Sequence, residues 1–334
     1  MLLNTKIFES LHIQNQNRES ISSECSFESL GSYNLNMHIA AVFIVFSVSG
    51  FGIFISLFLA SLQSKNSLSS LLQLLKMFGI GVIAGTVWIH LLPEAFSQFS
   101  SPCLTGFWTI YGSTNAGIFA LLGAFFVHVI ELICGGHSHH EDQGFDLLEQ
   151  KGFNQFSIHD FNDIKQSDQS AFHMVSTQVQ AVILEFGILL HSFVIGLTLG
   201  VTPDSEFSSL LIAVCFHQMF EGIALGVLVA NARLKQFTKM FLGALYTLTT
   251  PLGISIGIGV RDSFNSNSLS AIVIIGVLNS LSAGILMYNT YCELVSQEVN
   301  HNKSFSGYSN GFKTICLLFM YSGAVCMGIL ALWA

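Results

Sequence analysis

Long apolar runs separated by shorter polar stretches make up most of the chain. Each run is close to or longer than the ~20 residues that an α-helix needs to cross ~30 Å of hydrocarbon. The runs are continuous and lack two-residue alternation, which favours helices over a β-barrel. The pattern predicts an all-α polytopic membrane protein, a bundle of eight transmembrane helices at residues 39–62, 71–97, 116–134, 177–201, 208–230, 240–260, 268–292 and 312–334.

Composition agrees with this class. Hydrophobic residues make up 51% of the chain and charged residues 10%, and the mean hydropathy is +0.61. A soluble domain carries about 25% charged residues. We therefore expect the lipid bilayer as a partner and no nucleic acid.

The basic residues indicate an orientation. Cytoplasmic connections carry an excess of Lys and Arg, so the richer side is the inner one. The poorer side holds both termini, which are predicted to be extracytoplasmic. Nine basic residues lie on the inner side (65, 76, 151, 165, 233, 235, 239, 303 and 313) and three on the outer side (6, 18 and 261).

The chain divides into four parts. Residues 1–38 form a polar tail without a signal-peptide pattern, and residues 39–134 hold the first three spans. Residues 135–176 form a polar, acidic cytosolic loop that we expect to be mostly disordered. Residues 177–334 hold the remaining five spans. The loop carries a short His tract that can bind metal but also suits a plain solvated loop, at His137, His139 and His140.

Seven cysteines are scattered along the chain without a CxxC pair. Cys25 and Cys103 fall on the same predicted extracytoplasmic side. A disulfide between them and two unpaired thiols are both compatible with the sequence.

Two related decapeptides place ionisable groups inside predicted spans. "HSFVIGLTLG" begins at His191, and "HQMFEGIALG" begins at His217 and contains Glu221. Such residues are costly in a bilayer and by default suggest a function. His217 and Glu221 are four residues apart, so they share one face of a helix.

Depth allows the two decapeptides to meet. His191 lies ten residues before the predicted outer end of its span, and His217 lies nine residues after the start of the next. At ~1.5 Å per residue, both lie about 15 Å below the outer boundary. We expect these antiparallel spans to pack together. Two imidazoles and a carboxylate suit Zn²⁺, Fe²⁺ or Mn²⁺ better than Ca²⁺ or Mg²⁺.

Other polar residues have weaker assignments. Ser192 and Gln218 can add oxygen ligands, whereas Ile195 leaves the first decapeptide without a carboxylate, which favours a single metal. His90 and Glu94 are predicted either to pass a cation inward or to form an interfacial pair. Glu185 is predicted to face another span than His191 does, as a supporting group or a structural hydrogen-bond partner. The alternative for the whole set is interhelical hydrogen bonding without metal.

The chain resembles the ZIP (Zrt/Irt-like) family of metal transporters, particularly its plant and fungal branch, over most of residues 39–334. The resemblance rests on "GVIAGTVWIHLLPEA", "LEFGILLHSFVIGLTLG", "CFHQMFEGIALG", "TTPLGISIGIG" and "GVLNSLSAGILMY".

The resemblance implies transport of divalent metal toward the cytosol through a site between the fourth and fifth spans. It assigns His191, His217 and Glu221 as core ligands, and His90 and Glu94 to cation entry and pH response. Zn²⁺ is then substrate rather than cofactor, with Fe²⁺, Mn²⁺ and Cd²⁺ as other candidates, and no resident cofactor is expected. Some members place a carboxylate where Ile195 stands.

Location, assembly and competing functions complete the expectations. We expect the plasma membrane, with an internal membrane as the alternative, and a homodimer as one candidate assembly. The competing readings are an intramembrane metal-dependent enzyme, a transporter of protons or organic ions, and a non-transporting scaffold. The sequence contains no HExxH and no GxSxG, which weakens the enzyme reading.

Overall fold

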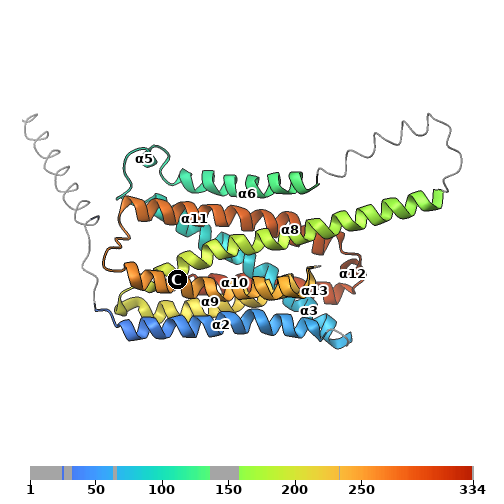
Figure 1. Ribbon diagram of the computed structural model, residues 1–334, viewed down its shortest axis with the longest axis horizontal. Helices are drawn as coiled ribbons and strands as arrows, with labels where there is room; N and C mark the ends of the chain where they lie inside the picture. The colour runs from blue at the N-terminus through green and yellow to red at the C-terminus, as the bar shows by residue number, and fades with distance from the viewer. Residues whose placement is uncertain (1–24, 26–31, 63–65, 136–157, 233, 333–334) are drawn as a thin grey trace, which may run out of the picture.

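The computed structural model describes residues 25, 32–62, 66–135, 158–232 and 234–332. Its regular structure is entirely helical in this part of the chain (Figure 1). The elements are α2 (Leu35–Ser61), α3 (Asn66–Gly85), η1 (Thr86–Leu91), α4 (Leu92–Phe99), α5 (Trp108–Tyr111), α6 (Thr114–Gly135), α8 (Ile158–Val201), α9 (Asp204–Asn231), α10 (Gln236–Val260), α11 (Leu269–Tyr288), η3 (Asn289–His301), α12 (Lys303–Ser306) and α13 (Asn310–Leu330).

Eight helices among the described residues are long and apolar enough to cross a membrane, which confirms the predicted bundle. The first begins slightly earlier than expected because Asn34 caps it and accepts hydrogen bonds from the N–H groups of Asn36 and Met37. The fourth and fifth spans are joined by only two residues, Thr202 and Pro203. This short connection holds His191 and His217 at a similar depth.

Helix α8 differs from the expectation for the long loop. It begins at Ile158, well before the predicted start of the fourth span at residue 177. Once a helix is nucleated, each further residue adds a hydrogen bond at small entropic cost, so a stable span can extend into polar sequence. The His tract of the loop lies outside the described residues.

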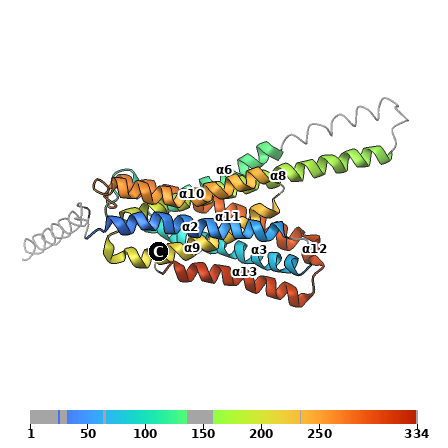
Figure 2. The same cartoon turned by 60° about the horizontal axis from the view of Figure 1, so that its bottom comes forward.

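The first and last described spans leave the bundle at the same end, where α2 begins and α13 finishes (Figures 1 and 2). We call this end the outer end and the opposite end the inner end, after the predicted orientation. Which side of the membrane each end faces stays a prediction from the basic residues.

The spans pack as two groups of four. Group A contains α2, α8, α9 and α10, in which α8 packs on α10 and α2 packs on α9 and α10. Group B contains α3 with η1 and α4, α6, α11 with η3, and α13, in which α3 packs on α13 and α6 on α11. The groups meet chiefly where α3 contacts α9 and α11 contacts α8.

Glycines draw the helices of group A together. A Cβ atom at Gly200 would lie 2.5 Å from the carbonyl oxygen of Ile254 on α10, and one at Gly226 would lie 2.7 Å from that of Ile53 on α2. Small residues let helix backbones approach closely in lipid. The spans predicted to pack together, α8 and α9, therefore meet at their histidines but pack more extensively on α10 and α2.

Candidate metal site

His191 of α8 and His217 of α9 lie side by side in the interior. Their Nε2 atoms are 3.2 Å apart. The Oε1 atom of Glu221 is 3.3 Å from His217 Nε2 and 4.0 Å from His191 Nε2. All three residues are buried, with relative exposures of 1%, 3% and 1%. The structure thus brings together the three residues that the decapeptides predict as ligands.

These separations suit a small tetrahedral ion. Zn–N and Zn–O bonds are about 2.0–2.2 Å long, so two donors on one tetrahedral zinc ion lie roughly 3.3–3.6 Å apart. The 3.2 and 3.3 Å separations are close to that value. The 4.0 Å separation between His191 and Glu221 requires only a small shift of one side chain.

A third histidine reaches the same place from group B. His90 lies on η1, and its ring centroid is 5.2 Å from that of His191 and 5.4 Å from that of His217. One ring nitrogen from each of these three histidines lies within 4.8 Å of the other two. Since the sequence placed His90 near the outer end of its span, its position at the level of the other histidines is a finding of the structure.

The local backbone explains the position of His90. Residues Thr86–Leu91 form a π-helical turn between two α-helical segments. Pro93 follows shortly after His90 and has no N–H to donate to the carbonyl oxygen of Ile89, so regular α-helical bonding is interrupted. Such wide turns re-aim side chains and occur frequently at functional sites.

Thr86 contacts the site and was missed by sequence reasoning. Its hydroxyl donates to Glu221 Oε1 at 3.1 Å, and its side chain is buried. Group B thereby holds the carboxylate that group A supplies. A threonine in an apolar span gives no sequence signal, because Ser and Thr usually bond to their own helix, as Thr86 also does to Val82 O.

Ser192 and Gln218 are buried beside the histidines but face into group A. The Gln218 amide nitrogen donates to the hydroxyl of Thr250 on α10. Its Oε1 atom and the hydroxyl of Ser192 have no hydrogen-bond partner among the described residues. These oxygens remain available, but no contact joins them to the three core ligands.

A cavity of ≈ 410 Å³ leads from the outer end to the histidines. Its wall includes His90 and His217, and also Glu94, whose Oε2 atom is 3.9 Å from His90 Nε2. Glu94 therefore lies on the approach to the site, as the cation-entry reading predicts. Ile195 also lines this cavity, where a carboxylate in its place would face the approaching ion.

A second cavity, of ≈ 280 Å³, lies toward the inner end and is walled by residues of both groups. Leu184 and Leu228 line it, whereas neither histidine nor Glu221 does. Ile188 and Leu225, about one turn inward of the ligands, belong to the same buried apolar cluster as these leucines. The site is thus reached from the outer cavity and separated from the inner one by apolar side chains.

Glu185 is buried in α8 at 1% exposure, and neither carboxylate oxygen has a hydrogen-bond partner among the described residues. It does not join the histidine cluster, in agreement with the face that its spacing predicts. The interhelical hydrogen bond considered for it is not present there. An unpaired buried carboxyl is costly, so its retention calls for a functional explanation.

A buried cluster of imidazoles and one carboxylate, enclosed by eight spans and approached through a polar-lined cavity, defines an integral membrane protein of the metal-transporter class. The chain belongs to the ZIP zinc-transporter family, whose model matches residues 35–331. Family members are transporters, so the intramembrane-enzyme alternative is not favoured.

Individual relatives agree with this membership. The chain is 32% identical to "Zinc-regulated transporter 1" of Candida albicans over 90% of this chain and 62% of that protein. It is 30% identical to "Fe(2+) transport protein 1" of Arabidopsis thaliana over 90% of this chain and 86% of the relative. It is 32% identical to "Zinc transporter 3" of the same plant over 78% and 73%. The chain thus spans less than two thirds of the fungal relative.

Proposed function

We propose that this chain carries divalent transition-metal ions, zinc foremost, across the plasma membrane into the cytosol. The observation that carries the proposal is the buried contact of His191 and His217 with Glu221, at separations that suit one zinc ion. The relatives named for zinc and for Fe(2+) support zinc and iron as substrates.

The proposed mechanism is alternating access between the two groups. Group A supplies His191, His217 and Glu221, while group B supplies His90 and Thr86. The ion enters by way of Glu94 and sheds water at the buried ligands. A displacement of group A against group B then opens the ligands to the inner cavity. The glycines of α8 and α9 keep group A together as it moves, rather than forming the sliding surface.

The roles of the groups follow from ligand chemistry. Neutral imidazole and ionised carboxylate bind metal, so protons compete with the ion and acid slows uptake. Thr86 orients Glu221, and His90 completes the ligand set while the site is reached from the outer side. Apolar side chains inward of the ligands prevent a continuous water path. A homodimer and the absence of a resident cofactor stay predictions.

The test is uptake of radioactive zinc by metal-starved cells at matched surface expression. We expect His217→Ala and Glu221→Ala to reduce uptake at least about tenfold, since each removes a ligand. The matched control is Phe216→Ala on the same helix, a neighbour with 48% exposure toward lipid. Full uptake by both ligand variants would move the transport site elsewhere. Iron and manganese as competitors rank the substrates.

A further inference from the structure

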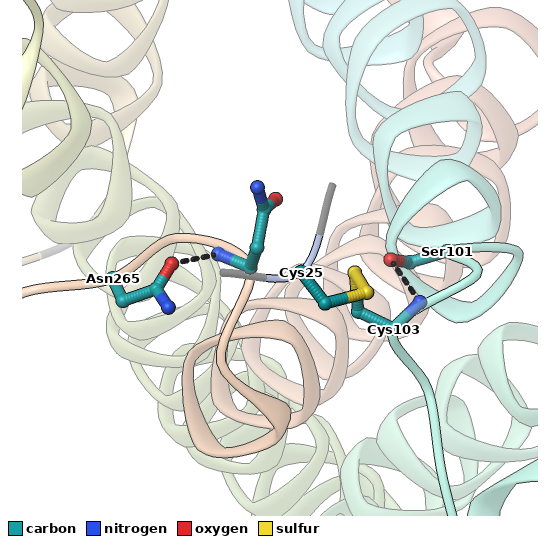
Figure 3. Close-up of a disulfide and its surroundings, with 5 residues drawn as sticks. Cys25, Ser101, Cys103 and Asn265 are labelled. Carbon is teal, nitrogen blue, oxygen red and sulfur yellow. Dashed lines mark hydrogen bonds between the residues drawn. A yellow bond between two sulfur atoms is a disulfide. The ribbon is translucent and has the colours of Figure 1, made fainter. Parts of the chain in front are cut away.

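A disulfide at the outer end fastens the N-terminal segment to group B. Cys25 is bonded to Cys103, which lies in the connection between α4 and α5 (Figure 3). Ser101 accepts a hydrogen bond from the Cys103 N–H at 3.2 Å and helps to fix this connection. The disulfide thus confirms one of the two alternatives that the sequence left open.

The surroundings of the disulfide belong entirely to group B. Both cysteines pack in one apolar cluster, in which Cys103 is 8% exposed and Cys25 is partly buried. The other members come from α4, α5, α6, α11 and the α4–α5 connection: Ala95, Phe99, Leu104, Trp108, Ala116, Phe119, Ile272, Val273 and Val277.

A few residues later, the same segment is fastened to group A. The Asp204 N–H donates to Ser32 O at 3.0 Å, and the Asn34 N–H donates to Asp204 Oδ1 at 2.8 Å. The Tyr33 hydroxyl donates to the carbonyl oxygen of Gly200 at 2.7 Å. The guanidinium of Arg261 lies 3.7 Å from the centre of the Tyr33 ring. These contacts join the segment to α8, α9 and the end of α10.

His38 strengthens this attachment. Its ring stacks on Tyr33 at 3.8 Å and lies 3.9 Å from the ring of Phe207 on α9. Its Nε2 atom is 3.0 Å from the carbonyl oxygen of Thr202 in the α8–α9 turn. The side chain is fully buried. The segment from Ser32 to His38 is therefore part of group A.

The disulfide consequently links the two groups across their boundary. Six residues of sequence separate Cys25 from Ser32. At about 3.3–3.6 Å per residue, a link of this length spans at most roughly 25 Å. The continuous chain also joins the groups at this end through residues 261–268. Two links at one end restrict rotation as well as separation, and a reductant cuts only the disulfide.

We propose that the Cys25–Cys103 disulfide is a redox-sensitive tether that limits how far group A moves relative to group B at the outer end. The proposal rests on the alternating-access function proposed above. When the disulfide is intact, the outer ends of the groups stay within the reach of the link. When it is reduced, the N-terminal segment remains with group A and leaves group B.

The switching reaction is ordinary disulfide reduction. A dithiol attacks one sulfur as its thiolate, forms a mixed disulfide and is itself oxidised, leaving Cys25 and Cys103 as two thiols. A water-soluble phosphine does the same in vitro: it takes an oxygen from water to become a phosphine oxide, and the two protons of that water end on the cysteines. Both routes transfer two electrons to the disulfide.

The test uses purified full-length protein in liposomes and measures initial zinc flux. Wild type is compared before and after treatment with a membrane-impermeant phosphine that is removed without oxygen. We expect reduction to raise the flux roughly twofold or more, the lower range of measured conformational couplings. Cys25→Ser should match reduced wild type and should not respond to the phosphine. Cys326→Ser, which removes a free cysteine, should respond as wild type does.

Two outcomes would overturn the tether. One is zinc flux that reduction leaves unchanged, and the other is an equal response in Cys25→Ser. Absence of flux in every sample would instead contradict the proposed function. Hydrogen exchange then decides the tether separately, because reduction of the folded wild type should speed exchange where α3 meets α9 and α8 meets α11. Unchanged exchange there would overturn the tether without any reference to flux.

Discussion

The Nε2 atoms of His191 and His217 face each other across 3.2 Å although the two residues are 26 positions apart in sequence. Between two neutral imidazoles, a contact of this kind holds one proton, with one nitrogen donating and the other accepting. A metal ion would replace that proton and use both lone pairs. The geometry of the pair therefore connects the fold of two helices directly to metal binding.

His90 should be important for metal affinity without supporting the fold. We expect His90→Ala to raise the KM for zinc about tenfold, because it removes the nitrogen that group B offers to the cluster. Zinc uptake over a concentration series measures this. Ile89→Ala, a change at an exposed neighbour in the same π-turn, is the control. An unchanged KM in His90→Ala would remove His90 from the ligand set.

Thr86 should act through Glu221. Thr86→Val keeps the shape of the side chain but removes the hydroxyl that donates to the carboxylate. Partners that orient a metal ligand typically contribute 10–100-fold to affinity, so we expect about tenfold weaker zinc binding. Thr86→Ser should retain most of the affinity, because it retains the donor. Titration of purified protein with zinc distinguishes the two variants, and equal affinities would show that the hydrogen bond has no such role.

Two glycines of α10 should respond oppositely to the same substitution. A Cβ at Gly257 would lie 2.6 Å from the carbonyl oxygen of Leu197 on α8, whereas one at Gly259 meets no atom within 4 Å. We expect Gly257→Ala to destabilise the fold by roughly 1–3 kcal/mol. Gly259→Ala should be neutral or stabilising by up to about 1 kcal/mol, because alanine favours the helix. Thermal unfolding in detergent measures both, and similar melting temperatures would contradict this packing of α8 on α10.

Glu185 should cost stability and serve transport. We expect Glu185→Leu to raise the melting temperature, because it replaces a buried carboxyl that lacks a hydrogen-bond partner among the described residues. Zinc uptake by the same variant should fall, since such a group is otherwise unexplained. Glu185→Gln, which keeps the shape and a polar head, tests whether the carboxyl itself is needed. Full uptake by Glu185→Leu would leave the residue without a functional role.

Sequence reasoning predicted the spans because lipid requires long apolar helices with internally satisfied backbones. It also predicted the meeting of His191 with His217, since a short connection fixes the relative depth of neighbouring spans. It missed the level of His90, because a π-turn changes the direction of a side chain without changing hydropathy. It also missed Thr86, whose role depends on the neighbouring helix.

Packing between helices was harder to predict than their existence. The glycine pattern indicated close contacts but could not name the partners, and the structure assigns Gly200 to α10 and Gly226 to α2. The pairing of Cys25 with Cys103 likewise depends on tertiary position rather than on spacing. The assignment of residues to groups A and B therefore required the structure.

The most direct test of the account is zinc flux into liposomes that contain only the purified protein. An imposed zinc gradient drives the ion, and a trapped zinc-sensitive dye reports its entry. The account predicts entry with wild type and with Phe216→Ala, and at least tenfold slower entry with His191→Ala, His217→Ala and Glu221→Ala. Zinc entry at the wild-type rate in folded Glu221→Ala and His217→Ala protein would contradict transport through this site.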